Sequence, residues 1–490
     1  MSSYKQIAKS SGLIAFVSIF QMVFGLLRNK IIAVLLGAKG FGIYGLFQVF
    51  VETAITFASL GLDKSGVRQI ARYGDSTVDR DRCIAVFFRG LLVTSVFTAL
   101  ICIVFSKAIS QSLFNTEDYY VGIILASGAV ILRSISQGQI SILNGIRDLR
   151  GLALSQILAA VIGSILSVVF IVFMGLDGIV LSFVSFGLAS LLFSYYFVRK
   201  QKIQKVTYTR TEFFTEFRLL IYLGLGFSVS AAIASFFTFL SRSYIGSFFD
   251  IEVVGIYQAC WLISNMYIGI ILTAMGVDFM PRLMKSIDDV VKVRKMVNEQ
   301  MELGALLSGV GVIFIILFSE ILLILLYSSE FSAGSSIIRW QVLGVSLRVL
   351  GFPLAHSVMA FKKPVWYALI QSVFALIEYL FLILFTKYYG FDGLGISYFA
   401  GYIIFMLMWY VATRKLFKFS FSKKLIYILV LNWTGIIVAI LLTRFLNGVY
   451  LYVLGILFLI IYIGVVSKIM ERFMRLSVIS LIKNKISKKK

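Results

Sequence analysis

Long apolar runs, separated by short polar segments, repeat along the whole chain. A helix needs about 20 predominantly apolar residues to cross a hydrocarbon core of about 30 Å, and fourteen runs reach that length. A membrane-spanning strand would be about half as long and would alternate polar and apolar positions. The runs therefore predict an all-α polytopic membrane protein with fourteen transmembrane helices. They cover residues 11–36, 41–61, 84–106, 120–142, 152–174, 178–198, 219–245, 253–277, 303–327, 337–361, 365–386, 393–413, 425–443 and 449–467.

The composition agrees with this class, because 60% of the 490 residues are hydrophobic and only 14% are charged. The 46 Lys and Arg residues outnumber the 23 Asp and Glu residues, and most of them lie at the termini and in every second loop. Cytoplasmic loops of membrane proteins carry this excess, so we predict that both termini are cytoplasmic. Binding to nucleic acid would instead need basic residues gathered on a soluble face. The opposite loops are too short to form an exterior catalytic domain.

Three longer loops, around residues 62–83, 199–218 and 278–302, are basic and amphipathic. Two interpretations are open for them. Their charges can serve as orientation signals on interfacial helices, or they can contact anionic lipid headgroups.

The chain contains an internal repeat with a nearly constant offset. Gly175-Leu176-Asp177-Gly178 recurs 215 residues later as Gly390-Phe391-Asp392-Gly393, and Leu132-Arg133 recurs at the same offset as Leu347-Arg348. The repeat predicts two six-helix lobes, residues 1–210 and 211–418, followed by residues 419–490 with the last two spans and a basic cytoplasmic tail. Six spans is an even number, so the copies run in the same direction through the membrane. Such parallel repeats are typical of alternating-access transporters with a central cavity between the halves.

Charged residues inside spans are candidates for function, because burying a charge in a membrane is unfavourable. The candidate anion-binding residues are Arg28, Arg133, Arg348, Arg242 and Lys30. Arg133 and Arg348 occupy equivalent, deep positions of the repeat, and we expect them on facing walls of the central cavity.

Each candidate also has a structural interpretation. Arg28, Lys30 and Arg242 could extend toward lipid headgroups, and Arg133 and Arg348 could form internal salt bridges. The acids Glu52 and Glu378 could be counter-ions in those bridges or could bind the cation that couples transport to an ion gradient.

The sequence offers little for catalysis. It has one histidine, His356, and three cysteines, with no His/Cys cluster, phosphate-binding loop or nucleophile elbow. We therefore predict no catalytic residue, no metal site and no cofactor, and a protein that is not an enzyme.

Two motifs suggest a family. Gly25-Leu26-Leu27-Arg28-Asn29-Lys30-Ile31-Ile32-Ala33, with Gly37-Ala38 and Gly42-Ile43-Tyr44 after it, resembles the first-span signature of polysaccharide flippases. Phe318-Ser319-Glu320-Ile321-Leu322, followed by Glu330-Phe331, resembles the end of their ninth span. With its predicted topology, the chain resembles the Wzx-type flippases, which include O-antigen flippases. They belong to the multidrug/oligosaccharidyl-lipid/polysaccharide exporter superfamily.

The resemblance implies two lobes around a cavity that moves an undecaprenyl-diphosphate-linked oligosaccharide from the inner to the outer leaflet. It implies a bacterial cytoplasmic membrane location, a lipid-linked oligosaccharide substrate, and other polysaccharide-assembly membrane proteins as candidate partners. A proton or sodium gradient is the candidate energy source. Related peptidoglycan lipid flippases have a cationic residue at the position of Arg28.

A diphosphate headgroup needs charge compensation on its way through the membrane, and the planar donor pair of arginine suits phosphate oxygens. The deep arginines thus favour an anionic substrate. The alternatives are a drug/cation antiporter of the same superfamily and a membrane polysaccharide polymerase or ligase.

Overall fold

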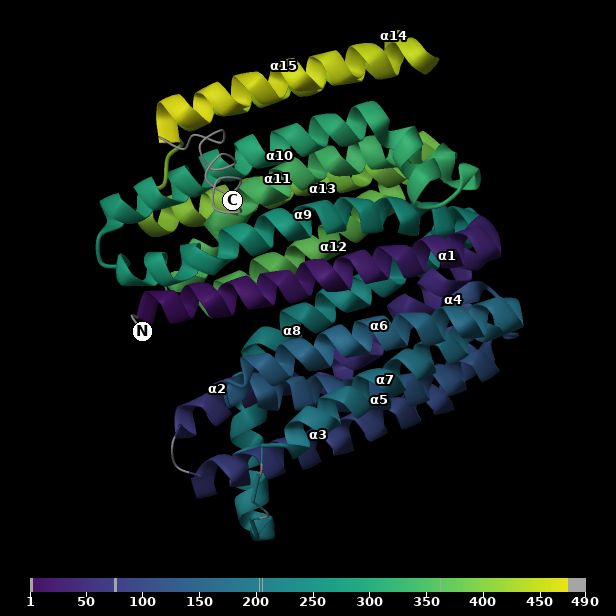
Figure 1. The fold of residues 1–490 in the computed structure, drawn as a ribbon, viewed down its shortest axis with the longest axis vertical. Coiled ribbons are helices and arrows are strands. Elements are labelled where there is room, and N and C mark those ends of the chain that lie inside the picture. The colour runs from purple at the N-terminus through teal and green to yellow at the C-terminus, as the bar shows by residue number, and fades with distance from the viewer. Residues whose placement is uncertain (1–2, 75–76, 202, 205, 362, 475–490) are drawn as a thin grey trace, which may run out of the picture. The chain divides into compact units, whose positions relative to one another are not determined.

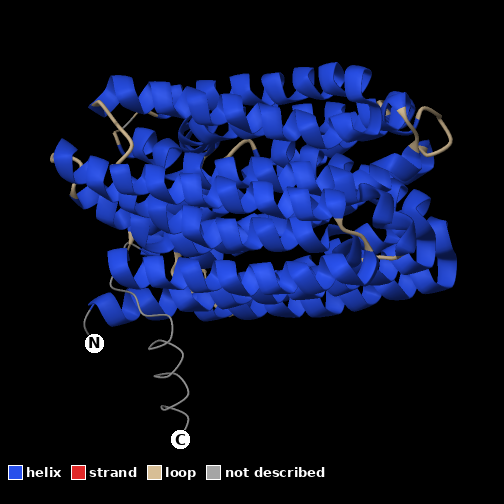
Figure 2. Cartoon of the chain, turned by 90° about the horizontal axis from the view of Figure 1, so that it is seen from above, coloured by secondary structure: helices blue, strands red, loops and turns tan. Residues whose placement is uncertain are grey.

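The computed structural model describes residues 3–74, 77–201, 203–204, 206–361 and 363–474. Helices and short connections make up this part of the chain, and Figure 2 shows no strand in it. The all-α class predicted from the apolar runs is therefore confirmed. The helices are α1 (Ser3–Ser59), α2 (Leu62–Tyr73), α3 (Thr77–Val104), α4 (Ser106–Phe114), α5 (Tyr120–Gly145), α6 (Leu149–Met174), α7 (Gly178–Arg199), α8 (Arg210–Phe248), α9 (Ile251–Lys285), α10 (Val290–Leu326), α11 (Ser335–Ala360), α12 (Pro364–Tyr389), α13 (Gly393–Phe417), α14 (Lys423–Phe445) and α15 (Gly448–Met474).

Ten helical segments of the described chain are long and apolar enough to cross a membrane. A further pair of helical segments, Arg210–Leu225 and Ser228–Phe248, is bent by 60°. If this pair counts as one span, the described chain has up to eleven candidate spans. Three of the ten, Phe16–Ser59, Leu149–Arg199 and Pro364–Phe417, have 44, 51 and 54 residues. Each of these three contains two of the apolar runs, so fourteen spans are compatible with the structure.

The repeated Gly-X-Asp-Gly motif adopts the same local structure in both copies. Each copy forms a short 3-10 helix, η1 (Gly175–Asp177) or η3 (Gly390–Asp392), between two long helices. The first glycine has a φ of 57° in one copy and 56° in the other. This left-handed conformation is accessible to glycine at little cost, which explains why both copies place glycine where one span ends.

A break inside α1 separates the first two apolar runs. Gly37 has φ 67° and ψ −174°, so the helix is interrupted there. The next residue, Ala38, donates its backbone N–H to Glu330 Oε2 at 2.8 Å. Glu330 lies in η2 (Ser329–Gly334), and its carboxylate takes the place of an N-cap acceptor at the start of the second run.

The chain forms two compact units that interleave in sequence. Unit 1 contains Met1–Leu262, Leu323–Gly334 and Lys362–Ser397, and unit 2 contains Ile263–Leu322, Ser335–Phe361 and Tyr398–Lys490. These units follow backbone packing, whereas the predicted lobes follow a sequence repeat. The division into lobes 1–210 and 211–418 therefore stays a prediction.

In unit 1, α5, α6 and α7 lie side by side, α1 packs on α6, and α8 packs on α12 (Figure 1). The amphipathic helix α2, within the predicted loop 62–83, buries Leu62, Gln69 and Ile70.

Unit 2 has its own buried polar connections. Asn432 on α14 donates to the Ala305 carbonyl on α10 at 2.7 Å and accepts from the Tyr462 hydroxyl on α15 at 2.6 Å. The amide of Asn432 is buried where α10, α14 and α15 meet. A buried amide is unfavourable unless it is hydrogen-bonded, and these two bonds provide the partners.

Candidate functional site

Unit 1 contains two adjoining polar cavities. One has a volume of about 540 Å³ and the other about 440 Å³. Both are lined by Asp63, Lys64, Arg133 and Gln137, so these four side chains lie where the cavities meet. Arg133, the deep arginine predicted as an anion ligand, thus lines open cavity space.

A polar stripe on α5 forms much of the larger cavity. The cavity-lining residues of α5 are Arg133, Ser136, Gln137, Ile140, Ser141 and Asn144. Their spacing follows one face of a helix. From α6 and α7, Ser155, Gln156 and Ser190 add further hydroxyl and amide groups. This wall offers many hydrogen-bond donors and acceptors to a ligand in the cavity.

Glu52 faces Arg133 across the smaller cavity. Arg133 Nη1 lies 4.0 Å from Glu52 Oε1, and the Arg133 side chain is 22% exposed while that of Glu52 is 54% exposed. A distance of 4.0 Å is too long for a direct hydrogen bond. The two side chains therefore form a loose ion pair, and a stronger anionic ligand could replace the carboxylate next to Arg133.

Arg28 and Arg133 share one aromatic neighbour. The guanidinium carbon of Arg28 lies 5.3 Å from the centre of the Phe186 ring, and that of Arg133 lies 5.9 Å from it. Arg28 also lies 5.9 Å from the Tyr44 ring centre, and its Nε is buried without a hydrogen-bond partner in the described structure. Two arginines from α1 and α5 therefore converge on one aromatic side chain of α7.

A chain of amides connects this site to Arg242. Arg242 is 3% exposed and donates from Nη2 to Gln258 Oε1 at 3.0 Å. Gln258 donates to Gln48 Oε1 at 3.3 Å, and Gln48 donates to Glu52 Oε1 at 3.4 Å. Arg242 also lies over the rings of Tyr257 and Trp261, at 4.3 and 5.5 Å. Such cation–π contacts help to stabilise a buried guanidinium.

The other predicted residues are in different places. Lys30 donates to the Leu325 carbonyl at 2.7 Å, away from the cavities. Glu378 lies on α12, close enough to Arg242 for an electrostatic interaction, and its role as a counter-ion or a coupling residue stays a prediction. Arg348 belongs to unit 2, where its Nη1 donates to Asn265 Oδ1 at 2.9 Å. The pairing of Arg133 with Arg348 across one cavity stays a prediction.

Several cavity residues were not among the predicted candidates. Lys64 and Asp63 form an ion pair at 3.5 Å and line both cavities, and the Phe186 ring is within 6 Å of both guanidinium groups. The polar stripe on α5 could have been found from the sequence, because Ser, Gln and Asn recur after Arg133 at helical spacing. In the described residues, no group of three His, Cys, Asp or Glu side chains is arranged to hold a metal ion.

The chain matches the model of the family described as "Polysaccharide biosynthesis protein" over residues 7–287. It is 23% identical over 413 residues to the "Lipid III flippase" of Escherichia coli (strain K12), covering 81% of this chain and 96% of that protein. It is 25% identical over 371 residues to the "Putative O-antigen transporter" of Shigella flexneri, covering 74% and 87%. Its fold is similar to that of the solved "Lipid II flippase MurJ, inward closed conformation", with a TM-score of 0.74, 16% identity, and coverage of 95% of this chain and 100% of that one.

The family match covers more than half of the chain, so this protein belongs to the polysaccharide biosynthesis protein family. Its fold is similar to that of the solved flippase and to that of a solved multidrug resistance transporter, and the resemblance to polysaccharide flippases inferred from the motifs at Arg28 and Glu330 is confirmed. The two curated relatives are named as a flippase and a transporter rather than as enzymes.

Proposed function

We propose that this protein is a flippase for a lipid-linked oligosaccharide. The substrate would be an undecaprenyl-diphosphate-linked repeat unit of an O-antigen or a similar surface polysaccharide. It would move from the inner to the outer leaflet of the bacterial cytoplasmic membrane by alternating access, with both termini of the protein in the cytoplasm. Family membership and the names of the curated relatives support a lipid-linked substrate.

The observation that carries the proposal is the cavity lined by Arg133. Its guanidinium forms a loose ion pair with Glu52 at 4.0 Å. A diphosphate offers several oxygens and more negative charge than one carboxylate, so it can engage the planar donors of arginine in pairs. We infer that the diphosphate takes the place of Glu52 beside Arg133 when substrate binds.

The remaining walls suit the sugar part of the substrate. Ser136, Gln137, Asn144 and Gln156 present hydroxyl and amide groups to a cavity of about 540 Å³. Such groups can both donate to and accept from sugar hydroxyls. A pocket for a drug molecule would be lined mainly by apolar side chains, and most residues that line this cavity are polar or charged.

A drug/cation antiporter is less well supported. Two carboxylates, Glu52 and Asp63, line the smaller cavity, and both have a basic neighbour. Glu52 lies near Arg133 and Asp63 near Lys64, so neither offers an unopposed negative charge to an organic cation. A polymerase or ligase is less well supported because the curated relatives are named as a flippase and a transporter.

The proposal can be tested with purified protein in liposomes. The probe is a fluorescent oligosaccharide on undecaprenyl diphosphate, and flipping is read by the loss of label accessible to a membrane-impermeant quencher. We expect protein-dependent flipping of the diphosphate lipid and none of the same glycan on an uncharged polyprenol. Accumulation of a cationic dye without flipping of the diphosphate lipid would contradict the proposal and support the antiporter.

The energy source is tested in the same liposomes. We propose that a proton or sodium gradient drives the cycle through Glu52 or Glu378. Flipping should then be faster when one of these gradients is imposed, and it should return to the basal rate when an ionophore dissipates that gradient. A rate that responds to neither gradient would exclude the coupling.

A further inference from the structure

A third cavity in unit 1, of about 690 Å³, is separate from the site of Arg133. It lies between α3, α5, α7 and the segment that connects α7 to α8, here called the strap, whose described residues are 200–201, 203–204 and 206–209. Much of its wall is apolar. The apolar lining residues are Ile84, Ala85, Phe88, Ile142, Val198, Ile203 and Val206.

Two polar groups in this cavity lack the partners that their chemistry calls for. Arg89 lies 5.0 Å over the ring of Tyr208, and in the described part of the chain no carboxylate lies within ion-pair distance of it. The Tyr208 hydroxyl is buried and has no hydrogen-bond partner among the described residues. Burying a hydroxyl without a partner is unfavourable, so a ligand oxygen at this point would stabilise the arrangement.

The acid in the cavity is already neutralised. Asp81 lines the wall, but its Oδ1 lies 3.0 Å from Arg80 Nη2, and its Oδ2 accepts the backbone N–H of Gln204 at 2.9 Å. Asp81 therefore fixes the strap to α3 and leaves the charge of Arg89 uncompensated. The nearby residues Arg199, Lys200 and Arg210 at the ends of the strap are also basic.

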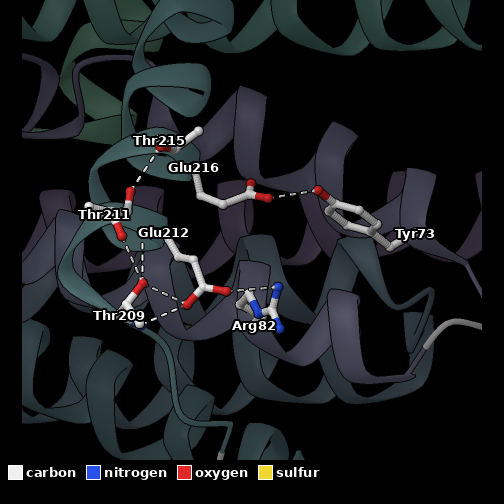
Figure 3. Close-up of polar contacts among 7 residues, drawn as sticks. All are labelled: Tyr73, Arg82, Thr209, Thr211, Glu212, Thr215 and Glu216. Atoms are coloured by element: carbon white, nitrogen blue, oxygen red, sulfur yellow. Dashed lines mark hydrogen bonds and ion pairs between the residues drawn. The ribbon is translucent and has the colours of Figure 1, made fainter.

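The strap is held firmly where it enters α8, as Figure 3 shows. The Thr209 backbone N–H donates to Glu212 Oε2 at 2.7 Å, and the Glu212 N–H donates to Thr209 Oγ1 at 3.3 Å, which forms a capping box. Glu212 also lies 3.5 Å from Arg82 on α3.

One turn further along α8, Glu216 accepts from the Tyr73 hydroxyl on α2 at 3.1 Å. Burial and this carboxylate raise the pKa of Tyr73 to about 12, so the phenol remains a donor at neutral pH. The cavity wall is therefore built from anchored elements on both sides of Tyr208.

We propose that this cavity binds the headgroup of an anionic glycerophospholipid. The lipid phosphate would lie against the Arg89 guanidinium and accept from the Tyr208 hydroxyl, while an acyl chain would cover Phe88, Ile142 and Val198. The cavity lies near the ends of the long apolar helices α5 and α7, where headgroups are expected. Arginine can place its aliphatic part in an apolar wall and its charge at a phosphate.

The test uses the full-length protein in detergent micelles with added lipid. Retention of phosphatidylglycerol, phosphatidylcholine or inorganic phosphate is measured by native mass spectrometry and by the shift in thermal midpoint. We expect phosphatidylglycerol to be retained and to stabilise the protein, whereas phosphatidylcholine does so less. A charge-assisted hydrogen bond contributes about 1.5–3 kcal/mol, so Arg89→Gln should weaken phosphatidylglycerol binding by roughly tenfold or more.

Two further variants keep the test specific. Tyr208→Phe removes only the hydroxyl and should weaken binding by about fivefold. Lys200→Gln removes a strap charge that does not line the cavity and should leave binding nearly unchanged. Undiminished phosphatidylglycerol binding by Arg89→Gln would overturn the proposal. Equal losses in the Lys200 and Arg89 variants would also overturn it, because general surface charge would then explain the binding. Stabilisation by inorganic phosphate alone would identify an ion site instead of a lipid site.

Discussion

Glu52 and Arg133, on α1 and α5, approach each other to 4.0 Å at the edge of a polar cavity. The pair is partly exposed, and exposed ion pairs contribute only about 0.2–1 kcal/mol. Glu52 is also the last acceptor in the amide chain that begins at Arg242. The Glu52 carboxylate is therefore linked through Gln48 and Gln258 to the buried Arg242, and it also forms the loose ion pair with Arg133.

This geometry makes a prediction for Glu52→Gln. Glutamine removes the charge that competes with the substrate for Arg133, so diphosphate lipid should bind up to about fivefold more tightly. Release should slow, and the flipping rate at saturating substrate should fall. Binding is measured by titration of labelled lipid and flipping in liposomes, with Glu117→Gln, which removes an exposed carboxylate paired with Lys107, as the matched variant outside the cavity. Unchanged affinity with loss of the response to an ion gradient would identify Glu52 as a coupling site instead.

The break at Gly37 predicts a position-specific effect on stability. An alanine there would have to hold φ 67° and ψ −174°, a backbone region that is essentially restricted to glycine, at a cost of about 1–3 kcal/mol, and its Cβ would meet Glu330 Oε2 at 2.9 Å. We expect Gly37→Ala to lower the thermal midpoint. Gly25→Ala on the same helix has open space around the new methyl group and should be neutral or slightly stabilising. Equal changes in the thermal midpoint for the two substitutions would show that the backbone conformation at residue 37 does not require glycine.

Glu212 predicts a dependence of stability on pH. The hydrogen bond from the Thr209 backbone, then that from its side chain, and the Arg82 charge lower the pKa of Glu212 below its ordinary value of 4.5. A depressed folded-state pKa contributes stability above the unfolded-state value, and this contribution is lost as the pH falls through the folded-state value. The difference in thermal midpoint between the wild type and Glu212→Gln should thus be largest at neutral pH and should shrink below pH 4.5. A constant difference would contradict the capping role.

The orientation is tested by cysteine labelling. The three native cysteines of the protein are buried, so cysteines introduced in loops should give most of the labelling signal. Thr116→Cys and Asn447→Cys should react with a membrane-impermeant thiol reagent in intact cells, whereas Thr207→Cys should react only after permeabilisation. Reversal of this pattern would place the termini outside the cytoplasm.

Most of the fold was predictable because each span has its own apolar run and each turn its own signal. Gly175 and Gly390 mark equivalent span ends, and both have a positive φ. Gly37 belongs to the motif that resembles the family signature, yet its role depends on Glu330, 293 residues away in the sequence, which accepts the backbone N–H of Ala38. The bend in α8 was also not evident from hydropathy, since the apolar run 219–245 continues through it without a break.

The site was less predictable than the fold. Depth in the span identified Arg133, because a charge far from both interfaces needs a specific environment. The Gln48–Gln258 bond joins residues separated by 210 positions, and only helix packing brings them together. Neutral polar residues such as Gln137 and Ser141 lower the hydropathy of a span only slightly. Hydropathy alone therefore does not identify them as cavity residues, and their helical spacing from Arg133 is needed.

Affinity for diphosphate lipid at Arg133 is the most direct test of the proposed function. Binding of a labelled undecaprenyl-diphosphate oligosaccharide is titrated against the wild type, Arg133→Ala, Arg133→Lys and the exposed control Arg218→Ala. We expect a loss of roughly tenfold or more for alanine, partial recovery for lysine because the charge remains without the planar donor pair, and no change for the control. Wild-type affinity in Arg133→Ala, with protein of normal stability, would contradict the assignment of this cavity as the headgroup site.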